Sequence, residues 1–126
     1  MGIFSKKKKV LLVEDEADIL EGLKARLSLE DFEIFTASDG KTGVELARQE
    51  KPNLIILDVM LPTLTGYDAC RVLKKDDATK HIPILILTAL PHLEDAEEAF
   101  RAGANDFLNK PYTNERLMSK IEKLLS

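Results

Sequence analysis

Short runs of apolar residues alternate along this chain with segments whose apolar residues recur every three or four positions. Continuous apolar runs are typical of strands buried on both faces, whereas the longer spacing is typical of amphipathic helices. The strands that we predict cover residues 10–13, 32–37, 54–58, 83–87 and 106–109. A helix is expected after each strand, and the residues expected to face inward include Leu23, Leu27, Val44, Ala47, Cys70, Leu73, Ala99, Phe100, Leu117 and Ile121.

The alternation of strand and helix predicts an α/β fold with a parallel sheet covered by helices on both faces. The strand at 54–58 is the most apolar and should be central, whereas Glu33 and Thr36 alternate with apolar residues and place the strand at 32–37 at an edge. With right-handed crossovers, the expected order is 2-1-3-4-5, counted along the chain. We therefore expect a flavodoxin-like doubly wound sheet of five strands with five helices.

Composition narrows the class of protein. The chain has 126 residues, enough for one domain, and its net charge of −4 argues against general nucleic-acid binding. Its single cysteine, Cys70, excludes an internal disulfide and favours a reducing, cytoplasmic location. Residues 1–8 carry a run of lysines and are expected to be a solvated basic tail without stable membrane association, followed by one domain over 9–126.

Polar side chains follow the predicted strands where these strands end. Glu14 and Asp15 follow the first strand, Asp58 ends the third, Thr88 follows the fourth and Lys110 follows the fifth. Because the carboxyl ends of parallel strands share one edge, these side chains should meet there. Three carboxylates would repel one another unless a cation such as Mg²⁺ joined them, and a lysine and a hydroxyl could stabilise a phosphoryl group transferred to Asp58.

Each of these residues also has an ordinary structural explanation. Glu14 and Asp15 could cap the following helix, Thr88 could simply end a strand, and Lys110 could be solvated. That all of them fall on the same edge of the predicted sheet favours a functional site.

Four segments resemble the response-regulator receiver domain of two-component signalling, of which the chemotaxis receiver is a member. They are residues 13–16 (VEDE), 57–62 (LDVMLP), 87–89 (LTA) and 103–111 (GANDFLNKP), and the similarity extends from Lys9 to the end of the chain. The resemblance implies a phosphorylation-activated signalling module. It also implies a regulatory phosphoacceptor that assists its own modification and is not an enzyme in the usual sense.

The resemblance also implies roles for single residues. Asp58 would accept the phosphoryl group, and Mg²⁺ would bind the side chains of Asp15 and Asp58, the backbone carbonyl of Met60 and, through water, Glu14. Lys110 would pair with Asp58 and then with the phosphoryl oxygens.

Two further residues would form the switch. Thr88 would close on the phosphoryl group, and Phe107 would be the switch aromatic, without the hydroxyl of the tyrosine that other members carry. Glu14 likewise stands where many members have aspartate, and the bond between Lys110 and Pro111 is expected to be cis.

Partners follow from the same resemblance. A histidine kinase or phosphotransfer protein would donate the phosphoryl group, and a downstream protein would bind the face formed by the fourth helix, the fifth strand and the fifth helix. The sequence does not decide whether phosphorylation also leads to a homodimer. No effector domain follows Ser126, so we expect a single-domain regulator or a receiver separated from its output module.

The lifetime of the phosphorylated form should depend on two apolar residues. Met60 and Leu90 lie two positions beyond Asp58 and Thr88, which in this family flank the path of the attacking water. Neither side chain can orient or activate water, so we expect slow self-dephosphorylation.

Three other functions fit the sequence less well. A flavin-binding protein of this fold would need a phosphate loop where the chain has Glu14 and Asp15, and an aspartyl phosphohydrolase would need an acid where it has Met60. A receiver that docks without being phosphorylated is opposed only by the presence of all the site residues.

Overall fold

The computed structural model describes residues 7–89 and 93–126, the side chains of 93–95 excepted. Its strands are β1 (Lys8–Val13), β2 (Phe32–Ala37), β3 (Leu54–Asp58), β4 (Ile84–Thr88) and β5 (Asp106–Asn109). Its helices are α1 (Ala17–Ser28), α2 (Gly40–Glu50), α3 (Gly66–Lys75), α4 (Leu93–Arg101) and α5 (Asn114–Leu125). The predicted elements are therefore confirmed, with β1 starting two residues earlier and β4 shifted by one residue.

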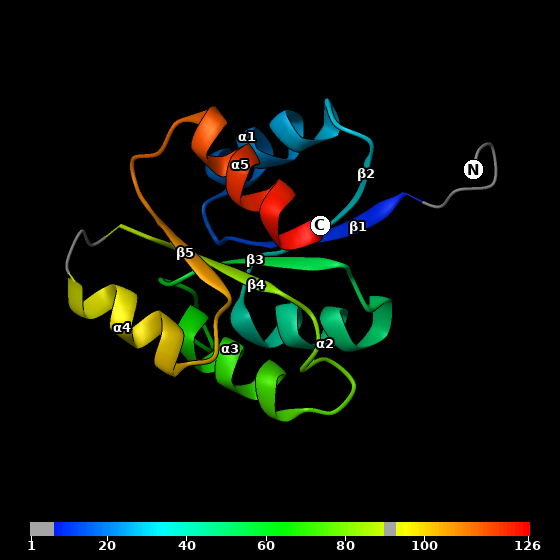
Figure 1. Cartoon of the computed structure of the whole chain (residues 1–126). Helices are drawn as coiled ribbons and strands as arrows, with labels where there is room; N and C mark the ends of the chain where they lie inside the picture. Colours follow the sequence, from blue (N-terminus) through cyan, green and yellow to red (C-terminus); the bar gives the residue numbers. More distant parts are fainter. Residues whose placement is uncertain (1–6, 90–92) are drawn as a thin grey trace.

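The strands form one parallel sheet in the order β2-β1-β3-β4-β5, as predicted. β3 is central, and all its residues are buried, like those of β4. α1 and α5 cover one face of the sheet, and α2, α3 and α4 cover the other (Figure 1). This is the doubly wound flavodoxin-like arrangement expected from the alternation of strands and helices.

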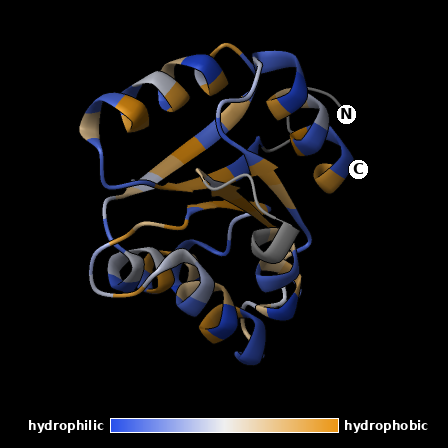
Figure 2. Cartoon of the chain, turned by 90° about the vertical axis from the view of Figure 1, so that its left-hand side faces the viewer, coloured by the Kyte–Doolittle hydropathy of each residue, from blue (hydrophilic) through white to orange (hydrophobic). Residues whose placement is uncertain are grey.

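Consecutive residues of the inner strands contribute to two separate cores. In β3, Ile55 and Leu57 pack against α2 and α3, whereas Leu54 and Ile56 pack against α1 and α5. Since side chains alternate between the faces of a sheet, a strand covered on both faces must be apolar at every position. Figure 2 shows the strands largely in the hydrophobic colour between two layers of helices of mixed colour.

One expected core residue lies outside the core. Phe100 is 51% exposed, whereas its neighbour Ala99 is fully buried, so the prediction that both face inward is wrong for Phe100. Neighbouring residues on a helix point in directions about 100° apart, and only one of them can face the sheet directly. The small side chain of Ala99 occupies this position in the core.

The described helices are short. Over residues 7–89 and 93–126, no helix is long and apolar enough to cross a membrane.

Candidate functional site

The carboxyl ends of β1 and β3 bring three acidic residues together. Glu14, Asp15 and Asp58 each offer one carboxylate oxygen, and these oxygens all lie within 4.8 Å of one another. Glu14 and Asp58 are buried, with 2% and 6% of their surfaces exposed, whereas Asp15 is open to solvent. An oxygen-rich cluster with one open side is suited to Mg²⁺, which binds a few carboxylates and keeps several water ligands.

Lys110 reaches this cluster from the end of β5. Its Nζ lies 2.7 Å from Asp58 Oδ1 and 3.4 Å from Glu14 Oε1. Its backbone N–H donates to the carbonyl of Thr88 at 2.7 Å, which continues the pairing of β4 with β5. The peptide bond between Lys110 and Pro111 is cis, as the resemblance implied.

The electrostatics of the cluster leave an excess of negative charge. Burial raises the pKa of Glu14, and repulsion by Asp58 adds to this, although the N–H of Glu16 and the ammonium of Lys110 act in the opposite direction. Burial alone would lower the pKa of Lys110, but the hydrogen bond and charge of Asp58, with Glu14, raise it. One ammonium cannot neutralise three carboxylates, so the remaining negative charge favours a divalent cation. The same charge would repel the phosphate group of a flavin.

The capping explanation for Glu14 and Asp15, the two acids that follow β1, is not supported. The N-cap of α1 is Glu16, and the first helical turn carries Asp18. Glu14 Oε2 accepts the N–H of Glu16 at 3.0 Å, which holds its carboxylate at the turn beside Asp58.

Thr88 lies on β4, the strand next to Asp58, and Phe107 lies on β5, one strand further from it. Asp58 pairs with Leu87 in the register of β3 and β4, so Thr88 is one residue further along the neighbouring strand, and it is buried. Phe107, on β5, is half-buried and packs against the core under α2, α3 and α4. Its ring meets that of Phe100 edge-on, with centroids 5.7 Å apart and planes at 86°.

The two residues expected to control dephosphorylation are only partly placed. Met60 lies in the loop after β3 and is 72% exposed. Leu90 lies outside the described residues.

Comparison with known proteins identifies the family. The family described as "Response regulator receiver domain" matches residues 10–122. The chain belongs to this family.

Relatives and solved structures agree with this assignment. The receiver is 41% identical over 119 residues to a protein described as "Probable transcriptional regulator ycf27" of Cyanophora paradoxa, covering 94% of this chain and 48% of that protein. A putative response regulator from Chloroflexus aurantiacus superposes with a TM-score of 0.91 at 32% identity, covering 95% of this chain and 98% of the other.

A third comparison concerns metal binding. The receiver domain of sensor histidine kinase PA1611 from Pseudomonas aeruginosa has a TM-score of 0.88 at 29% identity, covering 95% of this chain and 98% of that one. It is described with a magnesium ion coordinated in the active site cleft. The chain spans about half the length, or less, of the curated relatives it matches.

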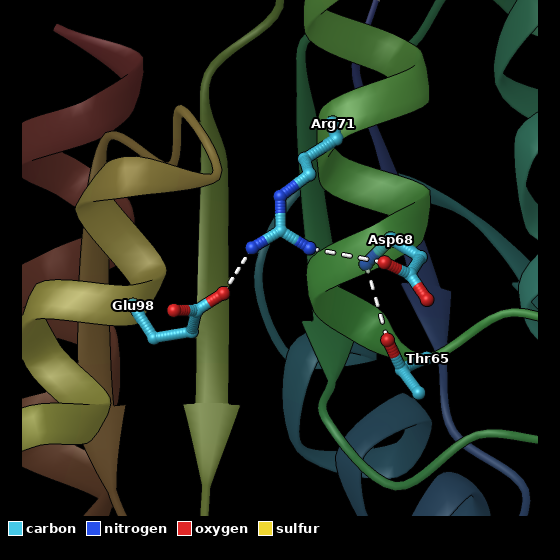
Figure 3. Close-up of polar contacts among 4 residues, drawn as sticks. All are labelled: Thr65, Asp68, Arg71 and Glu98. Atoms are coloured by element: carbon cyan, nitrogen blue, oxygen red, sulfur yellow. Dashed lines mark hydrogen bonds and ion pairs between the residues drawn. The ribbon is translucent and has the colours of Figure 1, made fainter.

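A polar chain of contacts connects the loop after β3 with α4 of the receiver. Thr65 caps α3 by accepting the N–H of Asp68 at 3.1 Å, and Arg71 donates to Asp68 Oδ1 at 3.0 Å. The other terminal nitrogen of Arg71 forms an ion pair with Glu98 of α4 (Figure 3). The spacing of Thr65 and Asp68 is a recognisable capping pattern, but sequence reasoning missed the link to Glu98.

Proposed function

We propose that this receiver accepts a phosphoryl group on Asp58 from a histidine kinase or phosphotransfer protein. The observation that carries the proposal is the position of Lys110 Nζ, 2.7 Å from Asp58 Oδ1, inside the cluster of three acids. A carboxylate oxygen of Asp58 would attack phosphorus while the bond to the donor histidine nitrogen breaks and the imidazole leaves. Lys110 would then pair with the negative oxygens of the transferred group.

Mg²⁺ would be held by the side chains of Asp15 and Asp58, the backbone carbonyl of Met60 and, through water, Glu14. The bound ion would neutralise part of the charge on the phosphoryl oxygens. The acid cluster and the magnesium described in the related PA1611 receiver support this assignment.

Phosphorylation would change the surface formed by α4, β5 and α5. Thr88 would close on the phosphoryl group, and Phe107 would turn inward into the space released. A downstream protein, or a second copy of the chain, would bind the altered surface. The charge added at Asp58 would in this way shift the α4–β5–α5 surface from one of two arrangements to the other.

The protein would work as a cytoplasmic regulatory phosphoacceptor that modifies itself, without turnover of a separate substrate. The single cysteine supports a location in a reducing compartment, and the net charge of −4 supports an output through proteins without direct nucleic-acid contact. We propose no stable membrane association.

Intact-mass measurement tests the phosphoacceptor. The parent chain and Asp58→Asn are incubated with Mg²⁺ and acetyl phosphate. The parent should gain the mass of one phosphoryl group, and Asp58→Asn should not. Equal labelling of both chains would show that another residue is modified.

A further inference from the structure

The loop between β3 and α3 carries Met60 and is ordered by its own backbone hydrogen bonds. The N–H of Leu61 donates to the carbonyl of Val59 at 3.1 Å, and the N–H of Gly66 donates to the same carbonyl at 2.9 Å. The N–H of Leu64 donates to the carbonyl of Pro62 at 2.8 Å. These bonds shape the loop, but they do not fix its position relative to β1.

A second set of bonds attaches the loop to the start of α2. The N–H of Gly40 donates to the carbonyl of Pro62 at 3.0 Å. The hydroxyl of Thr63 accepts the N–H of Lys41 at 3.0 Å and donates to Asp39 Oδ1 at 3.1 Å. Since α2 follows β2, the neighbour of β1, these bonds connect the loop to the part of the sheet that carries Glu14 and Asp15.

Asp39, which accepts the hydroxyl of Thr63, is held in place by further hydrogen bonds. Its carboxylate also accepts the N–H and the hydroxyl of Thr42, both at 2.8 Å. The bonds from Thr42, with that from Thr63, lower the pKa of Asp39, so it is a charged acceptor at neutral pH.

The backbone of Thr63 is unusual for its residue type. Its φ of 68° lies in the left-handed region, which glycine or asparagine adopts far more readily than a β-branched residue. A threonine in this conformation destabilises the backbone. The hydrogen bonds of its hydroxyl to Lys41 and Asp39 offset part of this cost. The close approach is tight at the other side as well, because a Cβ on Gly40 would lie 2.1 Å from the carbonyl oxygen of Leu64.

We infer that Thr63 and Asp39 are positioning residues of the metal site, a deduction that rests on the proposed function. Their bond holds the loop on α2 and thereby keeps the carbonyl of Met60 in place for a cation bound by Asp15 and Asp58. Neither residue contacts the cation. Removing the hydroxyl of Thr63 therefore weakens Mg²⁺ binding, although Thr63 is not itself a metal ligand.

Calorimetric titration with Mg²⁺, together with urea unfolding of the metal-free protein, tests this role. Thr63→Gly removes the hydroxyl and also relieves the left-handed backbone, so its metal-free stability should equal or exceed that of the parent. Its Mg²⁺ dissociation constant should rise about tenfold, at the low end of the effect of residues that orient metal ligands. A purely structural residue would not produce this separation of affinity from stability.

Two variants serve as controls. Thr63→Ser keeps the hydroxyl and should bind Mg²⁺ like the parent. Thr42→Ala removes a different hydroxyl bond to Asp39, away from the loop, and should also keep the parental affinity. Parental affinity in Thr63→Gly, or equal weakening in Thr63→Ser, would overturn the positioning role.

Asp15→Asn separates failure of this inference from failure of the proposed function. If Asp15→Asn weakens Mg²⁺ binding and Thr63→Gly does not, only the role of Thr63 is wrong. If Asp15→Asn binds Mg²⁺ like the parent, the proposed metal site is wrong and the role of Thr63 is overturned with it.

Discussion

Arg71 of α3 is paired with Glu98 of α4 and, on its own helix, with Asp68. The pair with Glu98 joins a helix that begins directly after the site loop to a helix of the proposed output surface (Figure 3). Both side chains are about one-third exposed, so water screens the pair and it contributes only modestly to stability.

Glu98→Gln should therefore loosen α4 without unfolding the protein. We expect a loss of about 0.5 kcal/mol of unfolding free energy, within the range of exposed ion pairs. Amide exchange in α4 should become faster. Glu97→Gln, which removes a pair with Arg101 inside α4, is the matched control and should leave the contact of α4 with α3 unchanged. Equal exchange in the two variants would contradict a link between the helices.

Asp15→Ala should weaken Mg²⁺ binding much more than Asp18→Ala. Asp15 belongs to the acid cluster, whereas Asp18 lies in the first turn of α1 and is exposed. Loss of one carboxylate should also relieve repulsion and stabilise the metal-free protein by about 1 kcal/mol. Calorimetry and urea unfolding measure the two effects. The same Mg²⁺ affinity in both variants would remove Asp15 from the site.

Cys70 should react slowly with alkylating reagents in the folded protein. Its side chain is fully buried, and burial raises the pKa of its thiol to about 11, so little thiolate forms at pH 8.5. A thiol whose pKa is raised by folding adds stability below the unfolded value of 9.0, and this contribution is lost as the pH rises through about 11. Iodoacetamide labelling at pH 8.5, with and without urea, measures the protection. Labelling at the same rate in both conditions would contradict it.

Met60→Asn and Leu90→Glu should shorten the lifetime of the phosphorylated receiver. Met60 is largely exposed beside the acid cluster, so its replacement should not disturb the core. A polar side chain there can orient the attacking water, and we expect dephosphorylation to become about tenfold faster, below the full effect of a positioned proton acceptor. Decay of the intact-mass signal gives the rate. Unchanged decay in both single variants and in the double variant would show that these side chains do not control it.

Activation should alter amides on one side of the molecule. With beryllofluoride and Mg²⁺, chemical-shift changes should concentrate between Thr88 and about Lys120. Thr88 is paired with β5, and Phe107 of β5 contacts Phe100 of α4. Lys120 belongs to this region, since its Nζ lies 5.9 Å from the centroid of the Phe107 ring. Changes limited to the loop after Asp58 would contradict the switch.

The sheet, and the proximity of the site residues at one edge of it, could be predicted because both depend on local sequence patterns. Apolar runs identify buried strands, and the acids at the ends of β1 and β3 reach one edge whatever the details of packing. The structure brings Glu14, Asp15, Asp58 and Lys110 together, whereas their roles in phosphorylation stay predictions.

The features that were missed depend on contacts between distant surface residues. Phe100 has an apolar side chain at a helix position next to the buried one, and hydrophobicity alone does not decide between neighbours. The bonds from Thr63 to Asp39 and from Arg71 to Glu98 join residues 24 and 27 positions apart, with no periodic pattern that marks them.

The alternation along β3 has a consequence for how mutations affect this protein. A slip of β3 by one residue against its neighbours would transfer every apolar side chain to the opposite core and turn Asp58 away from Lys110. The packing that keeps Leu57 on one side and Ile56 on the other therefore also selects the direction of the Asp58 carboxylate. A core substitution that changed this register would therefore separate Asp58 from Lys110 with every site residue still present.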